Sequence, residues 1–192
     1  NYTAMNIWKD LNKPILALAP MDDVTDSPFR QVVSDCAKPD MFYTEFVSVD
    51  GLSSEGRDSL IRKLHFSDKE TPIIAQIWGL IPENYQRITE EIVEMGFAGV
   101  DINMGCPDKT VVKNGCCTAL INNRPLAKEI IAATKEGAAG RIPVSVKTRT
   151  GFNEIDLTWH EFLLEQGIDA LIVHGRTRAN MSKVPNRWDV IE

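Results

Sequence analysis

The chain has 192 residues, 43% of them hydrophobic and 25% charged, with a formal net charge of −6. This composition is typical of one globular domain with a substantial core, and four cysteines are too few for a disulfide scaffold. No apolar run approaches the roughly 20 residues that span a bilayer, and no signal-peptide pattern opens the chain. We therefore expect a cytoplasmic protein with reduced thiols and no membrane partner. Met5 is a candidate natural start, which would make residues 1–4 a non-native remnant.

Charge is distributed unevenly along the chain. Residues 105–150 contain eight lysines or arginines and three acidic residues, whereas the remainder is strongly acidic. An acidic average argues against a polyanionic partner, but the basic segment leaves such a partner open.

Six short apolar runs recur along the chain, each rich in isoleucine, valine, leucine or alanine without regular alternation. This pattern is typical of parallel strands that are buried on both faces. The expected strands are residues 14–20, 41–47, 72–79, 99–105, 143–149 and 170–176.

Amphipathic segments lie between these runs and predict helices. The first begins with Ser27 and Pro28, a favourable N-cap and first-turn pair, and the next three each end at a glycine. The expected helices are residues 27–36, 82–96, 124–137 and 156–167, with weaker patterns at 52–66 and 188–192.

Strand and helix alternate six times without a hairpin signal, which predicts an α/β fold with a parallel sheet. An open doubly wound sheet and a (β/α)8 barrel both fit this alternation. No G-x-G-x-x-G sequence follows the first strand, which argues against a dinucleotide-binding fold.

Polar or ionisable residues near the C-terminal end of each run favour the barrel, because these ends converge on the active-site face. They are Glu45, Gln76, Asn103, Lys147 and His174, with Pro20, Met21 and Asp22 closing the first run. We therefore predict a TIM (β/α)8-type barrel that is incomplete here, with about six βα units, forming the N-terminal part of a longer protein.

The segment DINMGCPDKTVVKNGCCTAL, residues 101–120, holds Cys106, Cys116 and Cys117. Their spacing lacks C-x-x-C and no histidine lies nearby, so we expect no metal site. A disulfide between Cys106 and Cys116 is disfavoured in a reducing compartment. Cys106 follows a strand end in a rigid turn and is either a small turn residue or a working thiol, mostly protonated at neutral pH. We expect Cys116 and Cys117 to be structural.

Two further residues are polar side chains in buried-strand patterns, so each needs a hydrogen-bonding partner or a functional role. Lys147 lies inside a buried-strand pattern, where it could hold an anionic cofactor or form a Schiff base. His174 occupies the matching place one strand later and could donate a hydrogen bond or transfer a proton. Either residue could instead be a satisfied core or rim side chain.

Five segments in order resemble the tRNA-dihydrouridine synthases, which are flavin-dependent barrel enzymes. The N-M-G-C-P sequence followed by V-x-K-x-G is the most specific of them. The segments are APMDDVTDSPFR (19–30), AQIWG (75–79), DINMGCPDKTVVKNGCCTALI (101–121), SVKTRTG (145–151) and VHGRT (173–177). The resemblance implies that residues 1–192 form the N-terminal portion of a flavin-binding (β/α)8 catalytic barrel, without its last strands and helical C-terminal domain.

The resemblance also implies a cofactor, a reductant and a substrate: FMN, NADPH and tRNA. By position, Cys106 matches the catalytic general acid that protonates the uracil ring. Lys109 and Lys113 become candidates for RNA phosphate contacts. The positions that match FMN ligands are Pro20, Met21, Asp22, Gln76, Lys147 and His174, and those that match substrate contacts are Asn103, Glu45 and Arg149.

This chain departs from the family pattern at two places. Cys116 and Cys117 stand where a pair of small residues is usual, and Asn180 and Met181 follow the last motif in place of glutamine and an aromatic residue. Three other functions fit the residues alone: an FMN-dependent barrel oxidoreductase acting on a small molecule, a Schiff-base aldolase that uses Lys147, and a barrel that only binds RNA.

Overall fold

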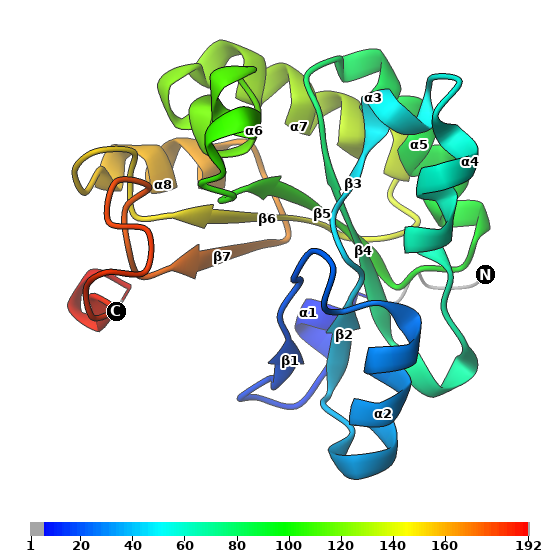
Figure 1. Ribbon diagram of the computed structural model, residues 1–192. Coiled ribbons are helices and arrows are strands. Elements are labelled where there is room, and N and C mark those ends of the chain that lie inside the picture. The colour runs from blue at the N-terminus through cyan, green and yellow to red at the C-terminus, as the bar shows by residue number, and fades with distance from the viewer. Residues whose placement is uncertain (1–5, 192) are drawn as a thin grey trace.

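The computed structural model describes residues 6–191, so the candidate start at Met5 and residues 1–4 lie outside the described part. One sheet runs in the order β1-β2-β4-β5-β6-β7, with β3 beside β4, and every pairing is parallel (Figure 1). The predicted α/β fold with a parallel sheet is therefore confirmed. The strands are β1 Ala17–Leu18, β2 Met41–Tyr43, β3 Val47–Ser48, β4 Ile73–Trp78, β5 Gly99–Met104, β6 Val144–Arg149 and β7 Ala170–His174.

The helices connect successive strands, as a barrel requires. The four strong helix predictions correspond to α2, α5, α7 and α8, whereas the short helices α1 and α6 were not predicted. The helices are α1 Ile7–Asp10, α2 Ser27–Ala37, α3 Val49–Leu52, α4 Arg57–Leu60, α5 Pro82–Glu94, α6 Lys109–Lys113, α7 Arg124–Ala138 and α8 Leu157–Glu165. The 3-10 turns are η1 Ile61–Leu64, η2 Asp68–Glu70, η3 Cys117–Asn122 and η4 Trp188–Val190.

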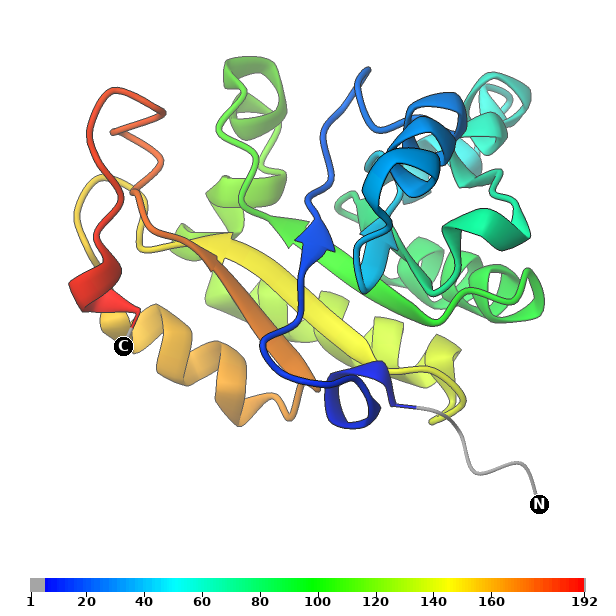
Figure 2. The same cartoon turned by 90° about the horizontal axis from the view of Figure 1, so that it is seen from below.

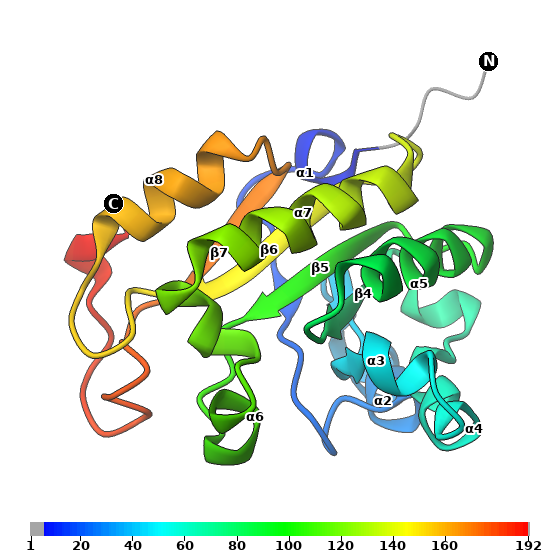
Figure 3. The ribbon, with the colours of Figure 1, turned by 90° about the horizontal axis from the view of Figure 1, so that it is seen from above.

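The sheet is curved and forms part of a barrel. Seen from above, α5, α7 and α8 lie across its outer face (Figure 3). Within residues 6–191 β1 pairs only with β2 and β7 only with β6, so these are the two edge strands of the sheet. Seen from below, β1 lies in the middle of the view, in front of β6 (Figure 2). The predicted incomplete TIM barrel with about six βα units is confirmed.

Two apolar clusters hold the barrel together. The larger packs the sheet against α5, α7 and α8 and includes Phe42, Ile102 and Trp159. The smaller surrounds Tyr43 and Ile74 with residues of α1 and β2. No helix in the described range has the length and apolar character needed to cross a membrane.

The start of α2 differs from the prediction by one residue. Asp26, not Ser27, is the N-cap, because its carboxylate accepts a hydrogen bond from the Phe29 amide at 2.9 Å. The Ser27 hydroxyl instead donates to Glu70 at 2.8 Å and ties α2 to η2.

The glycine at the predicted end of α7 is a packing residue. Helix α7 continues through Gly137 to Ala138, and Ala139 and Gly140 then adopt the left-handed conformation that ends it. A Cβ atom at Gly137 would lie 2.3 Å from the carbonyl oxygen of Gln86, so glycine lets α5 and α7 approach closely.

The predicted helix over 52–66 is wrong as a single element. The chain forms α3, α4 and η1 there, separated by a turn at residues 53–56. Gly56 starts α4 without a side-chain cap, which is consistent with the low helix propensity of the S-S-E-G sequence. At the other end of the chain, residues 188–190 form a 3-10 turn.

Candidate functional site

Strand register brings the polar residues of three strands together. Asn103 on β5 pairs with Lys147 on β6, and Arg149 on β6 pairs with His174 on β7. Gln76 on β4 pairs with Asp101 on β5, which is two residues before Asn103 on the same strand. Side chains two residues apart along a strand share a face, so these pairs form three successive rows on one face at the C-terminal end of the sheet.

One cavity of about 170 Å³ gathers half of the predicted site residues. Six sequence-predicted residues line it, together with Phe46, Gly105 and Pro107. The six are Pro20, Gln76, Asn103, Cys106, Lys147 and Arg149. The C-terminal end of a barrel sheet therefore collects groups from β4, β5, β6 and two loops, as expected of a TIM barrel.

The Cys106 turn is held from both sides. The Oδ1 atom of Asn103 accepts hydrogen bonds from the amides of Gly105 at 3.0 Å and Cys106 at 2.9 Å. The hydroxyl of Thr118 donates to the Cys106 carbonyl at 2.9 Å. The thiol therefore projects from a loop whose backbone is pinned at three points.

Cys106 is more acidic than an ordinary thiol. The pKa of Cys106 is lowered from 9.0 to about 7, chiefly by a hydrogen bond from the Cys117 thiol and also by the Asp108 amide and the positive charge of Arg149. Burial and the negative charge of Asp108 oppose the shift. An unperturbed thiol is mostly protonated at neutral pH, whereas a pKa of about 7 gives the thiol and thiolate of Cys106 similar populations there.

The neighbouring cysteines differ in role. All four cysteines carry free thiols, and Cys116 and Cys117 are buried as predicted. Burial raises the pKa of Cys116 to about 11, whereas the hydrogen bond to Cys106 is the largest cause that raises the pKa of Cys117. Cys117 is thus part of the Cys106 environment, and the purely structural role predicted for it is incomplete.

Lys147 lies near the buried carboxylate of Asp101. Burial lowers the pKa of Lys147, and the negative charge of Asp101 partly offsets this effect. Within residues 6–191 the Lys147 ammonium makes no hydrogen bond or ion pair, so its donors face the cavity uncommitted. Burial raises the pKa of Asp101 to about 6, which leaves that carboxylate mainly ionised at pH 7.

His174 has a free polar atom. Its Nδ1 is buried and has no hydrogen-bond partner among the described residues. Burial, with the positive charges of Arg149 and Lys147, lowers the pKa of His174 from 6.5 to about 4. A neutral imidazole with one unused ring nitrogen can donate to or accept from a ligand.

Arg149 joins the site to the loop after β7. Its Nε donates to the Gly105 carbonyl at 2.8 Å, and its NH1 group donates to the carbonyls of Thr177 at 3.2 Å and Met181 at 3.0 Å. Met181 stands where the family pattern has a different residue, but its contact with Arg149 is made by its backbone carbonyl and does not depend on the side chain.

Three predicted residues face a different cavity or solvent. The carboxylates of Asp22 and Glu45 pair with Lys63, the latter at 3.2 Å, beside a cavity of about 370 Å³ that Glu45 and Lys63 line. Met21 is 40% exposed, and its backbone amide and carbonyl bond to the Thr25 hydroxyl. These side chains do not line the Cys106 cavity.

The two predicted phosphate contacts lie at the rim. Lys109 and Lys113 are the first and last residues of α6, and both are exposed. The carboxylate of Asp108 caps this helix by accepting from the amides of Thr110 and Val111. Helix α6 projects from the same end of the sheet as the Cys106 turn (Figure 1).

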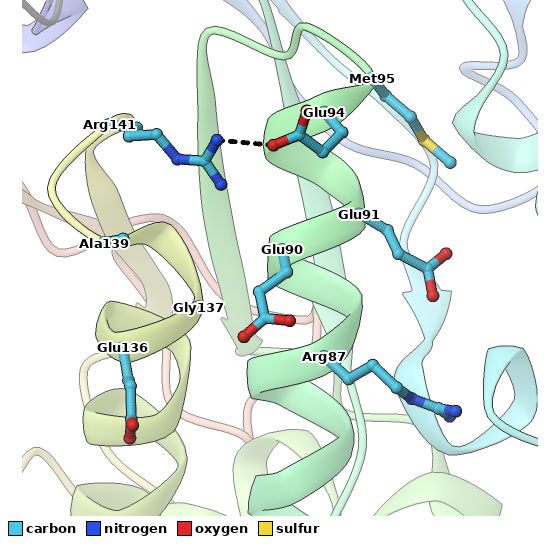
Figure 4. Close-up of a pocket in the computed structure, with 9 residues that line it drawn as sticks. All are labelled: Arg87, Glu90, Glu91, Glu94, Met95, Glu136, Gly137, Ala139 and Arg141. Carbon is cyan, nitrogen blue, oxygen red and sulfur yellow. Dashed lines mark hydrogen bonds and ion pairs between the residues drawn. The ribbon is translucent and has the colours of Figure 1, made fainter.

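A cavity of about 680 Å³ lies between α5 and α7, on the outer helical layer (Figure 4). Glutamates and two arginines surround it, and Arg141 pairs with Glu94 at 2.6 Å. None of the predicted site residues lines this cavity. Its larger volume does not make it the better candidate site, because the residues that line it include no nucleophile and no convergent set of hydrogen-bond donors.

Two site residues were missed from the sequence. Asp101 is a carboxylate inside a buried strand, and the reasoning that singled out Lys147 applies to it equally. Cys117 had no such signal, because its contact with Cys106 depends on a turn whose backbone is left-handed at Cys117, with φ of 53°.

Comparisons with known proteins identify relatives. The dihydrouridine synthase (Dus) family model matches residues 17–192. Probable tRNA-dihydrouridine synthase 2 of Bacillus subtilis (strain 168) is 46% identical over 190 residues, and the probable tRNA-dihydrouridine synthase of Staphylococcus aureus (strain COL) is 47% identical over 190 residues. Each alignment covers 97% of this chain, which spans 57% of the length of these two relatives.

Proposed function

The chain belongs to the dihydrouridine synthase family, and on that premise we propose that the complete protein reduces the C5=C6 bond of uridine in tRNA. FMN is the proposed cofactor and NADPH the proposed reductant, and the reaction takes place in the cytoplasm. Residues 1–192 are the N-terminal portion of the catalytic barrel in this proposal, and further strands and a helical domain belong to the longer protein. The observation that carries it is the convergence of Cys106, Asn103 and Lys147 on one cavity.

The residues of the cavity suit a flavin ring. The edge of the ring is rich in acceptor oxygens and nitrogens. Lys147 in the cavity, and His174 paired with Arg149 on the neighbouring strand, offer donors that no described residue uses. Lys147 would supply positive charge at this edge, and Gln76 and Pro20 would fix the ring in place. Met21 and Asp22 remain proposed contacts through the first loop rather than through the cavity.

Cys106 is the proposed general acid. Bound FMN, once reduced by NADPH, would supply the hydride that C6 of the uracil receives. The Cys106 thiol gives its proton to C5, and solvent then returns a proton to the thiolate. A pKa of about 7 suits this role, because a general acid works best when its pKa lies near the working pH.

Asn103 can contact the uracil while it holds the Cys106 turn. Its Oδ1 accepts from the Gly105 and Cys106 amides, and one hydrogen of Nδ2 goes to Gln76 at 3.0 Å. The second hydrogen of Nδ2 remains for a uracil carbonyl oxygen. Arg149 lines the same cavity, and we retain Glu45 as a contact for the surrounding RNA.

The substrate must reach the cavity as an extruded base. A uridine inside a folded tRNA has to leave its stack before its C5 and C6 atoms can meet a thiol and a cofactor. Lys109 and Lys113 on α6 are placed to contact the flanking phosphates. Within the basic segment 105–150, α6 lies at the rim of the cavity whereas α7 lies on the outer helical layer (Figure 3), so the proposed RNA contacts are those of α6.

The experiment compares Cys106→Ala with Cys116→Ala in the complete protein. We expect both variants to retain a yellow flavin spectrum, whereas only Cys106→Ala loses dihydrouridine formation, by about 10²-fold to 10⁴-fold. A normal rate in Cys106→Ala would show that another group is the acid. Turnover of free uracil without tRNA would instead favour a small-molecule reductase, and borohydride trapping on Lys147 would favour an aldolase.

A further inference from the structure

We propose that Asp101 is a positioning residue that sets the orientation of the Gln76 and Asn103 amides and thereby holds the Cys106 turn. The inference deepens the proposed function, on which its catalytic consequence rests, because Gln76 and Asn103 are the proposed cofactor and substrate contacts. Its structural content depends only on the contacts of β4, β5 and β6.

The first step is the contact between Asp101 and Gln76. Strand register aligns Gln76, Asp101 and Ser145 in one row across the sheet. The Asp101 carboxylate accepts from Gln76 Nε2 at 2.7 Å through one oxygen and from the Ser145 hydroxyl at 2.6 Å through the other. An ionised carboxylate can only accept, so the Gln76 side chain must turn its NH₂ group toward it.

The second step passes this orientation to Asn103. With Nε2 on Asp101, the Gln76 Oε1 faces away and accepts from Asn103 Nδ2 at 3.0 Å. The Asn103 Oδ1 is then left to face the amides of Gly105 and Cys106, and it accepts from both. A reversed Asn103 would place its NH₂ group against two N–H donors. One acceptor-only residue therefore decides the polarity of the whole series.

The surroundings keep Asp101 buried and ionised. Its side chain is fully buried, and the charged or titratable groups that face it are Lys147 from β6 and Tyr43 from β2. The Tyr43 hydroxyl has no hydrogen-bond partner in the described part of the chain. Burial of a carboxylate is costly, and two short hydrogen bonds with a nearby ammonium make it tolerable here.

The variants are chosen to separate polarity from packing. Asp101→Asn keeps an acceptor oxygen for Gln76, because its new NH₂ group can donate to the Ser145 hydroxyl while that hydroxyl turns to the Val100 carbonyl, now 3.5 Å away. Asp101→Leu keeps the volume and removes the acceptor. Ser145→Ala is the matched control, because it removes the other hydrogen bond to Asp101 and leaves the series intact.

The first measurement is the pKa of the Cys106 thiol in flavin-free complete protein, from the pH dependence of its alkylation. We expect Asp101→Asn and Ser145→Ala to keep this pKa near 7. Asp101→Leu should raise it by about one unit or more, because the loosened turn misaligns the thiol with its donors. An unchanged Cys106 pKa in a folded Asp101→Leu variant, or an equal rise in Asp101→Asn, overturns the proposal.

The second measurement uses the wild-type protein and so does not depend on the folding of a variant. The side-chain amide resonances of Gln76 and Asn103, assigned by their loss in Gln76→Met and Asn103→Ala, are followed by NMR as pH is lowered. We expect both to shift on one curve with a midpoint near 6, when Asp101 gains a proton. Resonances that stay constant, or that move independently, overturn it. Neither measurement requires flavin or tRNA, so failure here is distinct from failure of the proposed function.

Discussion

Replacement of Cys117 by alanine should make the Cys106 thiol less acidic. The Cys117 thiol is the largest cause of the low Cys106 pKa, and it acts by donating a hydrogen bond to the Cys106 sulfur. Alanine removes this donor and only one heavy atom, so the fold of η3 should survive. Burial and the negative charge of Asp108, which both raise the Cys106 pKa, are then opposed only by the Asp108 amide and the positive charge of Arg149.

The size of the effect follows from the two pKa values. Cys106 has a pKa of about 7, against 9.0 for an unperturbed thiol. Loss of the dominant stabilising contact should return most of this difference, a rise of about one to two units. At pH 7 the thiolate fraction then falls from about one half to between about one tenth and one hundredth.

The assay has two parts. Alkylation of Cys106 by iodoacetamide as a function of pH gives the thiol pKa directly, and dihydrouridine formation as a function of pH gives its effect on turnover. A general acid is active when protonated, that is, below its pKa. The alkaline fall in turnover should therefore begin near pH 7 in the wild-type protein and one to two units higher in Cys117→Ala.

Cys116→Ala is the control, since that thiol is also buried but is not among the causes of the low Cys106 pKa. It should leave both profiles in place. The reasoning is refuted if Cys117→Ala keeps the Cys106 pKa near 7, or if Cys116→Ala moves it as far. If the thiol pKa shifts but the alkaline fall in turnover stays at the same pH, Cys106 is not the general acid.

Three further outcomes are expected. Arg30→Ala should destabilise the protein by about 3–5 kcal/mol in urea unfolding, because it leaves Glu70 buried without its partner at 2.6 Å. His174 should titrate near pH 4 by NMR, and because its folded pKa is lowered, the native protein should lose stability as pH falls from 6.5 toward 4, less so in His174→Gln. Lys109→Ala and Lys113→Ala should each weaken tRNA binding and reduce its salt dependence by about one contact.

Controls for these outcomes come from the same chain. Arg141→Ala removes an exposed ion pair with Glu94 and should cost less than about 1 kcal/mol. Lys128→Ala changes a basic residue of the 105–150 segment that lies on α7 rather than α6, and should leave the salt dependence of tRNA binding unchanged. A midpoint near 6.5 for His174 would contradict the effect ascribed to its burial.

The strand order and the site layer could be predicted because both follow from local patterns. Apolar runs located all six βα units, and a polar residue near the end of each run indicated the face on which the site lies. The second run illustrates the limit of this pattern. It breaks into β2 and β3, because Thr44 turns its hydroxyl to the Glu45 carbonyl and to the Gln76 amide. Such a side-chain bond has no signature in apolar periodicity.

Residues in the first loop were harder to place. Position at the end of the first and second runs, together with the family resemblance, predicted Asp22 as a cofactor contact and Glu45 as a substrate contact. Lys63, from η1, pairs with both carboxylates. A pairing between residues 41 and 18 positions apart along the chain depends on tertiary packing. The role of Cys117 was hidden for a similar reason, since it lies eleven positions along the chain from Cys106, on the far side of α6.

The core of the site depends on strands that are paired on both sides. Gln76, Asn103 and Lys147 lie on β4, β5 and β6, each hydrogen-bonded to a strand on either edge. A one-residue slip between β5 and β6 would turn Lys147 to the opposite face, where the core of α7 and α8 would have to accept a charge. The free-energy cost of burying that charge disfavours the slip, and it therefore fixes the spacing of Asn103 and Lys147. By contrast, His174 lies on the edge strand β7, and Pro20 lies in the loop after the edge strand β1. The thiol, the amides and the lysine are therefore positioned by sheet register, whereas the histidine and the first loop depend on what packs against β7 and β1.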